Sequence, residues 1–385
     1  MSTTLTACFV ASPIPPNSST PYMPQWVSVN HDNPDVGSDG TSPLSRMACE
    51  QNLDPPDAPS RVLQEALSFS PGDTMRIYVP QGDQYSGLYV VDADGAIKLP
   101  FLPPIQVLGQ SAAALERRIA DLLVQAKLFQ PSFVQVSVQP MQWAPVQITV
   151  SGAVFQPGMV IINERKTDER GRPEGAATGD YAPGRLLTNA VRNAGGIRPD
   201  ADIAHVVVLR QGQRIPMDLR GALTAQPFSN PSLISGDQVD IPSLGCFQEA
   251  LMRPSAISPL GIRIYASTLT TPANSNSMAG ISKDSVSFPY GTRLLQALVS
   301  INCVGGNTLT NADRMAVLVT ANPVTGKSEA IQRSVEQLVH EPGRDAFNPY
   351  LLPNDAVACY ESGFATFRDV AKALVDFIAP TAGYH

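Results

Sequence analysis

Short stretches of alternating apolar and polar residues run along the chain, and each predicts a strand that buries one face. The first covers residues 75–79 and directly follows Pro71-Gly72-Asp73. Proline fixes φ and glycine tolerates positive φ, so this triplet predicts a tight turn that leads into the strand.

A second turn is predicted at Asp94-Gly95, which separates the apolar stretches 88–91 and 96–99. Both residues tolerate positive φ, so the pattern predicts a hairpin formed by these two stretches. The same residues resemble the start of a calcium-binding loop, but no further ligand follows at the required spacing. We therefore expect a hairpin here and no metal site.

A helix is predicted next, because apolar residues between Leu115 and Ala126 recur at helical spacing. Ser111 precedes them, and serine is favoured at helix N-caps. After a proline that should end the helix, valines at every second position from Val134 to Val138 predict another half-buried strand. The region is therefore a small α+β unit.

The second half of the chain contains a repeat. Residues 185–196 and 293–306 both begin with Arg-Leu-Leu and end with Gly-Gly, so each predicts a short helix that stops at glycine. An apolar strand follows in each copy. Each copy then reaches an Asn-Pro sequence and a predicted turn, at Gly236-Asp237 in the first copy and at Asn354-Asp355 in the second.

Composition narrows the range of functions. The chain has 385 residues, 43% of them hydrophobic, and lacks an uninterrupted apolar run long enough for a membrane helix. Its net charge of −7 argues against a nucleic-acid partner, because phosphate binding needs clustered Lys and Arg. The five cysteines and four histidines lack metal-ligand spacing, and no catalytic set emerges. We expect no metal, no cofactor and no enzymatic activity.

The Pro71-Gly72-Asp73 turn and the sequence of residues 92–100 resemble the first domain of outer-membrane polysaccharide export proteins. The repeated units resemble SLBB domains, the β-grasp repeats that follow this domain in the same family. The resemblance implies an α+β fold in five segments. These are a disordered Pro/Ser-rich segment (1–60), the polysaccharide-export domain (61–142), two SLBB-like β-grasp domains (143–250 and 251–362) and a C-terminal amphipathic helix (363–385).

The resemblance also implies a function, which is a ring-forming conduit for exopolysaccharide or capsular polysaccharide on the periplasmic side of the bacterial outer membrane. The implied partners are further copies of the chain, an inner-membrane polysaccharide co-polymerase, the exported polysaccharide and the outer membrane. Two alternatives stay open. One is a monomeric periplasmic protein that binds a glycan or small molecule with its β-grasp repeats, and the other is a carbohydrate-active enzyme.

The cysteines bear on export. Residues 5–8 match a bacterial lipobox, which predicts acylation of Cys8 and a lipid anchor, although the alternative is an ordinary cysteine in a disordered tail. Four cysteines then remain, and an oxidising periplasm would pair them. Cys303 and Cys359 are the preferred couple, with buried free thiols as the alternative.

The C-terminal segment predicts an amphipathic helix with charged residues opposite an apolar stripe. The 15 residues from 364 to 378 span roughly 22 Å at ~1.5 Å each, less than the ~30 Å hydrocarbon core of a bilayer. Crossing the outer membrane, lying at its interface and docking on a repeat domain all stay open. The stripe consists of Phe364, Phe367, Val370, Ala371, Leu374, Phe377 and Ile378.

Overall fold

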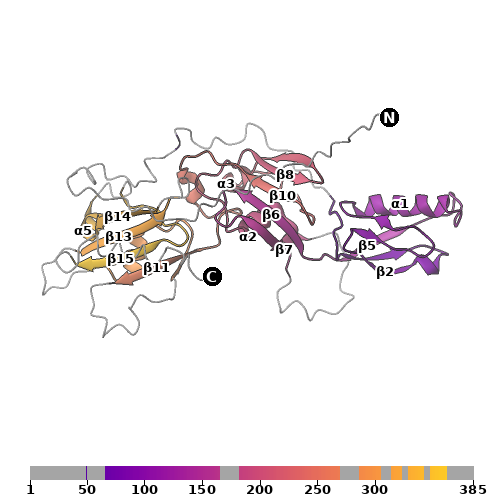
Figure 1. Cartoon of the computed structure of the whole chain (residues 1–385), viewed down its shortest axis with the longest axis horizontal. Helices are drawn as coiled ribbons and strands as arrows, with labels where there is room; N and C mark the ends of the chain where they lie inside the picture. Colours follow the sequence, from indigo (N-terminus) through magenta and orange to yellow (C-terminus); the bar gives the residue numbers. More distant parts are fainter. Residues whose placement is uncertain are drawn as a thin grey trace, which may run out of the picture.

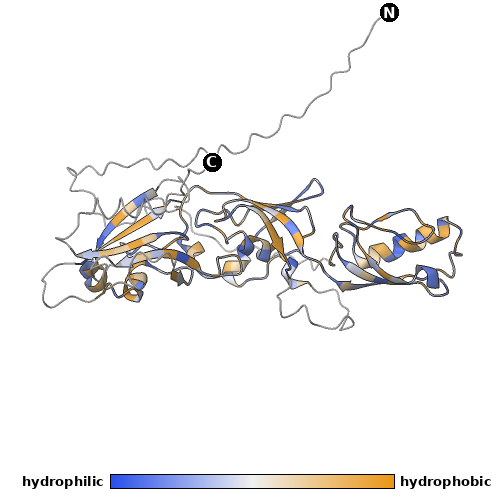
Figure 2. Ribbon diagram, turned by 60° about the horizontal axis from the view of Figure 1, so that its bottom comes forward, coloured by the Kyte–Doolittle hydropathy of each residue, from blue (hydrophilic) through white to orange (hydrophobic). Residues whose placement is uncertain are grey.

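The computed structural model describes Cys49 and residues 66–164, 182–268, 286–304, 314–322, 328–341 and 347–361. In these residues, three units lie in a row along the longest axis (Figure 1), and each has its own hydrophobic core. Hydrophobic residues lie along the central strands and helices of the units (Figure 2). The α+β class predicted from the sequence is confirmed.

The first unit packs one helix on an antiparallel sheet of order β2-β1-β5. Met75 and Ile77 of the sheet are buried in the same cluster as Leu115 and Ile119 of the helix. Ser111 is the N-cap as predicted, because its Oγ accepts the N–H of the third helical residue at 3.4 Å. The elements are β1 (Thr74–Tyr78), the 3-10 turn η2 (Asp83–Tyr85), β2 (Gly87–Val90), α1 (Ala112–Gln125) and β5 (Ser137–Gln142).

The hairpin predicted around Asp94-Gly95 is wrong in its pairing. The turn itself forms, with Gly95 at φ 77°. However, β2 pairs with β1, and the short strand β3 (Ala96–Ile97) pairs with β4 (Ile105–Gln106). The chain takes this path because the Gly95 carbonyl accepts the N–H of Val107 at 2.8 Å, which draws residues after the turn toward β4.

The strand predicted from Val134 begins later. Val134 N–H donates to the Gln130 carbonyl at 3.2 Å, so the chain after Pro131 stays in a turn. β5 therefore starts at Ser137, where its residues pair with β1.

The second and third units contain five-stranded sheets of matching order, β7-β6-β10-β8-β9 and β12-β11-β15-β13-β14. In each, the first and last strands of the unit pair in parallel, and the other neighbours pair antiparallel. The two units are therefore structural repeats of one another, as the duplicated sequence predicted.

The elements of the second unit are β6 (Val146–Gly152), β7 (Gly158–Ile162), η4 (Pro183–Arg185), α2 (Leu187–Asn193), β8 (Val206–Arg210), β9 (Gln213–Met217), α3 (Gly221–Thr224) and β10 (Gln238–Ile241). The turn η5 (Glu249–Met252) leads to the third unit. That unit contains β11 (Ile262–Thr268), β12 (Val286–Phe288), α4 (Leu294–Ser300), β13 (Arg314–Ala321), β14 (Ser328–Ser334), α5 (Val335–His340) and β15 (Ala356–Glu361).

The repeated Asn-Pro sequences satisfy helix N-termini that are distant in sequence. Asn230 Oδ1 accepts the N–H of Thr188 at 3.1 Å, and Asn348 Oδ1 accepts the N–H of Leu295 at 3.0 Å. The carbonyls of the prolines that follow accept the first N–H of the same helices. Each Asn-Pro sequence thereby provides acceptors for two of the four N–H groups that have no partner within the helix at its start.

Candidate functional site at the junction of the first two units

The turn at Pro71-Gly72-Asp73 lies against the second unit, and the Asp73 side chain is fully buried. Its Oδ2 accepts the N–H of Ser70 at 2.8 Å, which closes the turn. Gly72 has φ 85°, and a Cβ there would lie 3.1 Å from the Cβ of Ala144. The predicted turn residues thus place a carboxylate at the boundary between two units.

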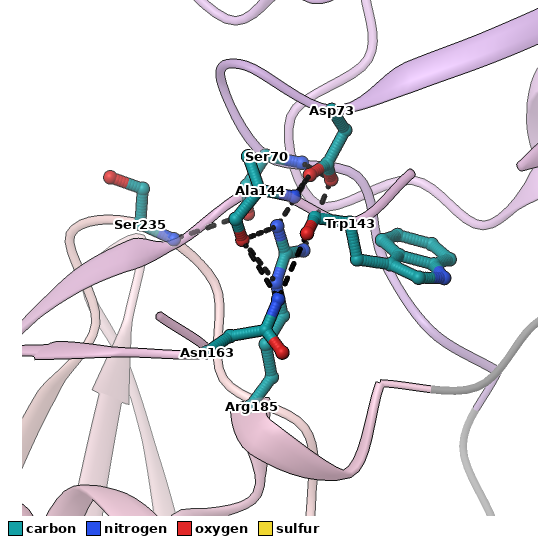
Figure 3. Close-up of polar contacts among 7 residues, drawn as sticks. All are labelled: Ser70, Asp73, Trp143, Ala144, Asn163, Arg185 and Ser235. Atoms are coloured by element: carbon teal, nitrogen blue, oxygen red, sulfur yellow. Dashed lines mark hydrogen bonds and ion pairs between the residues drawn. The ribbon is translucent and has the colours of Figure 1, made fainter. Parts of the chain in front are cut away.

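Arg185 of η4 meets this carboxylate and is also fully buried (Figure 3). Its Nη1 donates to Asp73 Oδ2 at 3.0 Å, and its Nη2 forms an ion pair with Oδ1. The backbone N–H of Ala144 donates to the same Oδ1 at 2.7 Å. The result is a two-pronged arginine–carboxylate pair, a geometry that fixes both distance and orientation.

The segment that joins the two units surrounds the guanidinium. The Ala144 carbonyl accepts Arg185 Nε at 3.1 Å, and the Trp143 ring centroid lies 5.2 Å from Arg185 Cζ. Trp143 also stacks on Phe69 with ring centroids 5.4 Å apart. Asn163 Nδ2 donates to the carbonyls of Trp143 and Ala144 at 2.9 and 3.2 Å. Both units therefore hold the linker in place.

Asp73 and Arg185 are opposite charges that are buried together at this junction. Burial raises the pKa of the Asp73 carboxyl, while the hydrogen bond and the positive charge of Arg185 oppose that rise. Removing one member of such a pair leaves the other as an uncompensated buried charge, which costs roughly 3–5 kcal/mol. We infer that the pair holds the first two units in one relative orientation.

An arginine of the third unit acts at the second junction. Arg293 directly precedes α4, and its Nη2 donates to Glu249 Oε1 in η5 and to Tyr350 Oη, both at 2.8 Å. Its Cζ lies 4.0 Å from the Tyr350 ring centroid. Both repeats thus have an arginine near the start of the helix that reaches the preceding part of the chain. The two arginines stand one position apart in the repeat, and the second pair is partly exposed.

The Gly-Gly end of α2 also serves the second junction. Gly196 has φ 80°, and a Cβ there would lie 2.3 Å from the backbone nitrogen of Pro259. The neighbouring Ile197 N–H donates to the Ile257 carbonyl at 3.0 Å. Glycine is needed here for its conformation and because the linker to the third unit passes so closely.

The other sequence-predicted site residues lie apart from this junction. Asp94 and Gly95 form their turn within the first unit, where Asp92 pairs with Lys98 at 2.8 Å on the surface. Cys303 and Cys359 form a disulfide with Cα atoms 6.0 Å apart. Cys8 and the C-terminal stripe (Phe364, Phe367, Val370, Leu374, Phe377 and Ile378) lie outside the described residues.

A second disulfide joins Cys49 and Cys246, whose Cα atoms are 5.1 Å apart. The Cys49 N–H also donates to the Phe247 carbonyl at 3.0 Å. Among the residues that the structure describes, no helix is long and apolar enough to cross a membrane, and no cluster of metal-ligating side chains occurs.

Sequence reasoning did not single out Arg185, Trp143 or Asn163 as site residues. The available signal was the Arg-Leu-Leu sequence that opens the predicted helix in both repeats, at positions 185 and 293. This sequence marks both arginines, but the carboxylate that pairs with Arg185 lies 112 residues away in the chain.

Comparison with known proteins decides the nature of the first unit. Residues 63–139 match the family model described as polysaccharide biosynthesis/export protein. The chain carries a polysaccharide export domain. The resemblance to the polysaccharide export family is thereby confirmed, and the Asp73 turn is part of this export domain.

Two curated relatives are polysialic acid transport proteins, KpsD, from Escherichia coli. They are 27% and 26% identical to the chain over 147 residues, which is 38% of this chain. The aligned region covers 22% of each relative, so the chain matches about a fifth of their length. Over 147 residues, the chain is thus similar to proteins that are named for polysaccharide transport.

Proposed function

We propose that this protein is a subunit of a ring that conducts a polysaccharide out of the cell. The observation that carries the proposal is the export domain, with its motif residue Asp73 in a buried ion pair with the next unit. Three units in series, fixed at their junctions, make an elongated subunit (Figure 1). Such a shape suits the wall of a passage, because lateral contacts between copies enclose a central opening.

The proposal includes location and partners. The protein acts on the periplasmic side of the bacterial outer membrane, with its repeats as SLBB-type β-grasp domains. Two disulfides support an oxidising compartment such as the periplasm. Its partners are further copies of itself, the exported capsular polysaccharide or exopolysaccharide, and an inner-membrane co-polymerase. Acylated Cys8, the C-terminal helix or both attach it to the outer membrane.

The proposal is tested by electron microscopy and by measurement of the molecular mass of the protein purified in a mild detergent. A closed oligomer with a central opening is expected. A variant with Asp73→Ala should give fewer closed rings, because its first two units are no longer held in one orientation. Asp92→Ala, which removes an exposed carboxylate of the same domain, is the matched control and should assemble normally.

A monomer at all concentrations contradicts the conduit. If that monomer binds a glycan specifically, the protein is a binding module instead. Cleavage of polysaccharide by the purified protein, abolished by replacing one carboxylate, would make it an enzyme.

A further inference from the structure

The third unit has a second apolar cluster on the outer face of its sheet, separate from its main core. The five side chains of this outer-face cluster are at most 3% exposed. They come from the neighbouring strands β13 and β15. They are Val317, Val319, Ala356, Ala358 and Tyr360.

The helices of the third unit do not cover this face. Buried residues of α4 and α5, such as Leu298 and Leu338, belong to the main core together with Leu318 and Val357, which point to the opposite side of the sheet. Within the described residues, only β11, β13 and β15 contribute side chains to the outer-face cluster. Its burial therefore requires a part of the chain beyond these elements.

The same face of the second unit has a different character. By sheet register, Val207 and Leu209 of β8 take the places of Val317 and Val319, and both are only half-buried. Gln238 and Asp240 of β10 take the places of Ala356 and Ala358, and both are polar and exposed. Within the described residues, the fully buried apolar outer face is thus particular to the third unit, and it indicates an occupant that the second unit lacks.

We propose that residues 363–378 of this chain form the occupant, as a helix that lays its apolar stripe on the outer-face cluster. This segment follows β15 directly, since β15 ends at Glu361. Its stripe of roughly 22 Å is comparable with the eight residues of β13, which span ~26 Å at ~3.3 Å each.

The width of the buried strip also fits a single helix. Strands lie ~4.8 Å apart, so the axes of three neighbouring strands span ~10 Å, which is about the diameter of one helix. The buried outer side chains lie on β13 and β15 and, through Ser267, on β11, whereas Ala330 and Gln332 of the neighbouring β14 are exposed. Gln332 Nε2 donates to Tyr360 Oη at 2.8 Å and forms a polar rim.

Small side chains in the floor of the cluster provide room for large ones in the helix. Ala356 and Ala358 stand side by side with Val319 and Val317 in the sheet register. The stripe supplies Phe364, Phe367, Leu374 and Phe377, and this pairing of large with small side chains favours close packing. A helix docked in this way cannot also place its stripe in a bilayer, so insertion requires its release.

The docking is tested in the full-length chain by photocrosslinking in detergent-free buffer. p-Benzoylphenylalanine replaces Leu374 on the apolar stripe or, as the matched control, Lys372 on the charged face. After irradiation, the position-374 protein should keep the mass of one chain and carry a crosslink to β13 or β15, and the position-372 protein should not. Crosslinks from position 374 to other units or to a second copy, or none at all, overturn the proposal.

A second measurement uses Leu374→Asp, with Lys372→Asp as the control that adds the same residue on the charged face. Leu374→Asp should raise binding of a fluorescent hydrophobic dye severalfold, because the outer-face cluster becomes exposed. Equal dye binding by the two variants contradicts the docking. The docking does not depend on the export role, so either proposal can fail while the other stands.

Discussion

Asp73 and Arg185 are the residues on which the first junction depends, because both are fully buried and each satisfies the other. We expect Asp73→Ala to lower the free energy of unfolding by roughly 3–5 kcal/mol, since the guanidinium is left buried without its counter-charge. Chemical denaturation measures the change. Asp92→Ala, at the exposed pair with Lys98, should lower the stability far less, because solvent screens that pair. Equal losses for both variants would mean that the buried pair does not hold the junction.

Three turns share one construction, and two of them pair their carboxylate with an arginine. Asp73, Asp237 and Asp355 each accept the N–H of the residue three positions earlier. Asp73 pairs with Arg185, and Asp237 pairs with Arg210 of β8. In the register of the third sheet, Thr320 fills the place of Arg210, and burial raises the pKa of Asp355 to about 8.

This difference predicts a pH dependence. Between the ordinary pKa of 3.8 and about 8, folded Asp355 binds its proton more tightly than the unfolded chain does. Its contribution to stability is therefore complete below pH 3.8 and is lost as the pH rises to about 8, at a slope of at most ~1.4 kcal/mol per pH unit.

The stability of the Asp355→Asn variant, measured by denaturation, should not fall in this way across the same pH range, because asparagine keeps the hydrogen bond without titrating. Asp237→Asn is the matched variant in the second unit and should leave the loss in place. A wild-type protein that becomes more stable from pH 5 to pH 8 in its third unit would contradict the assignment.

At the scale of elements, the end of α2 is a sharp test of how the second and third units fit together. Gly196→Ala meets both a positive φ of 80° and the backbone of Pro259, whereas Gly212→Ala meets a positive φ of 83° with nothing within 4 Å. The backbone strain common to both costs about 1 kcal/mol. We expect Gly196→Ala to lose clearly more stability than Gly212→Ala in calorimetry. Equal losses of stability in the two variants would show that the contact between residue 196 and Pro259 adds nothing to the cost.

Local chemistry predicted the elements well and their pairing less well. The Ser111 cap and the positive φ of Gly236 and Asn354 are set by the residues themselves, and both are found. The hairpin around Gly95 failed because strand pairing depends on distant partners. The Asp73–Arg185 pair was missed for the same reason, since nothing near either residue in the sequence indicates a contact across 112 positions.

At the scale of the whole molecule, two disulfides connect distant parts of the chain. Cys49–Cys246 closes a separation of 197 residues, and Cys303–Cys359 closes one of 56. Mass spectrometry of a non-reduced digest should find both linked peptides in protein made in the periplasm. Replacing Cys303 and Cys359 together by serine should cost about 2–5 kcal/mol. Finding free thiols at these positions would argue against an oxidising compartment.

The export claim is tested most directly by deleting the gene in its own bacterium and following the polysaccharide. We expect that the polymer is still made but no longer reaches the cell surface, and that the intact gene restores its export. A strain that lacks the protein and still displays its surface polysaccharide in normal amount would show that the protein has no role in export.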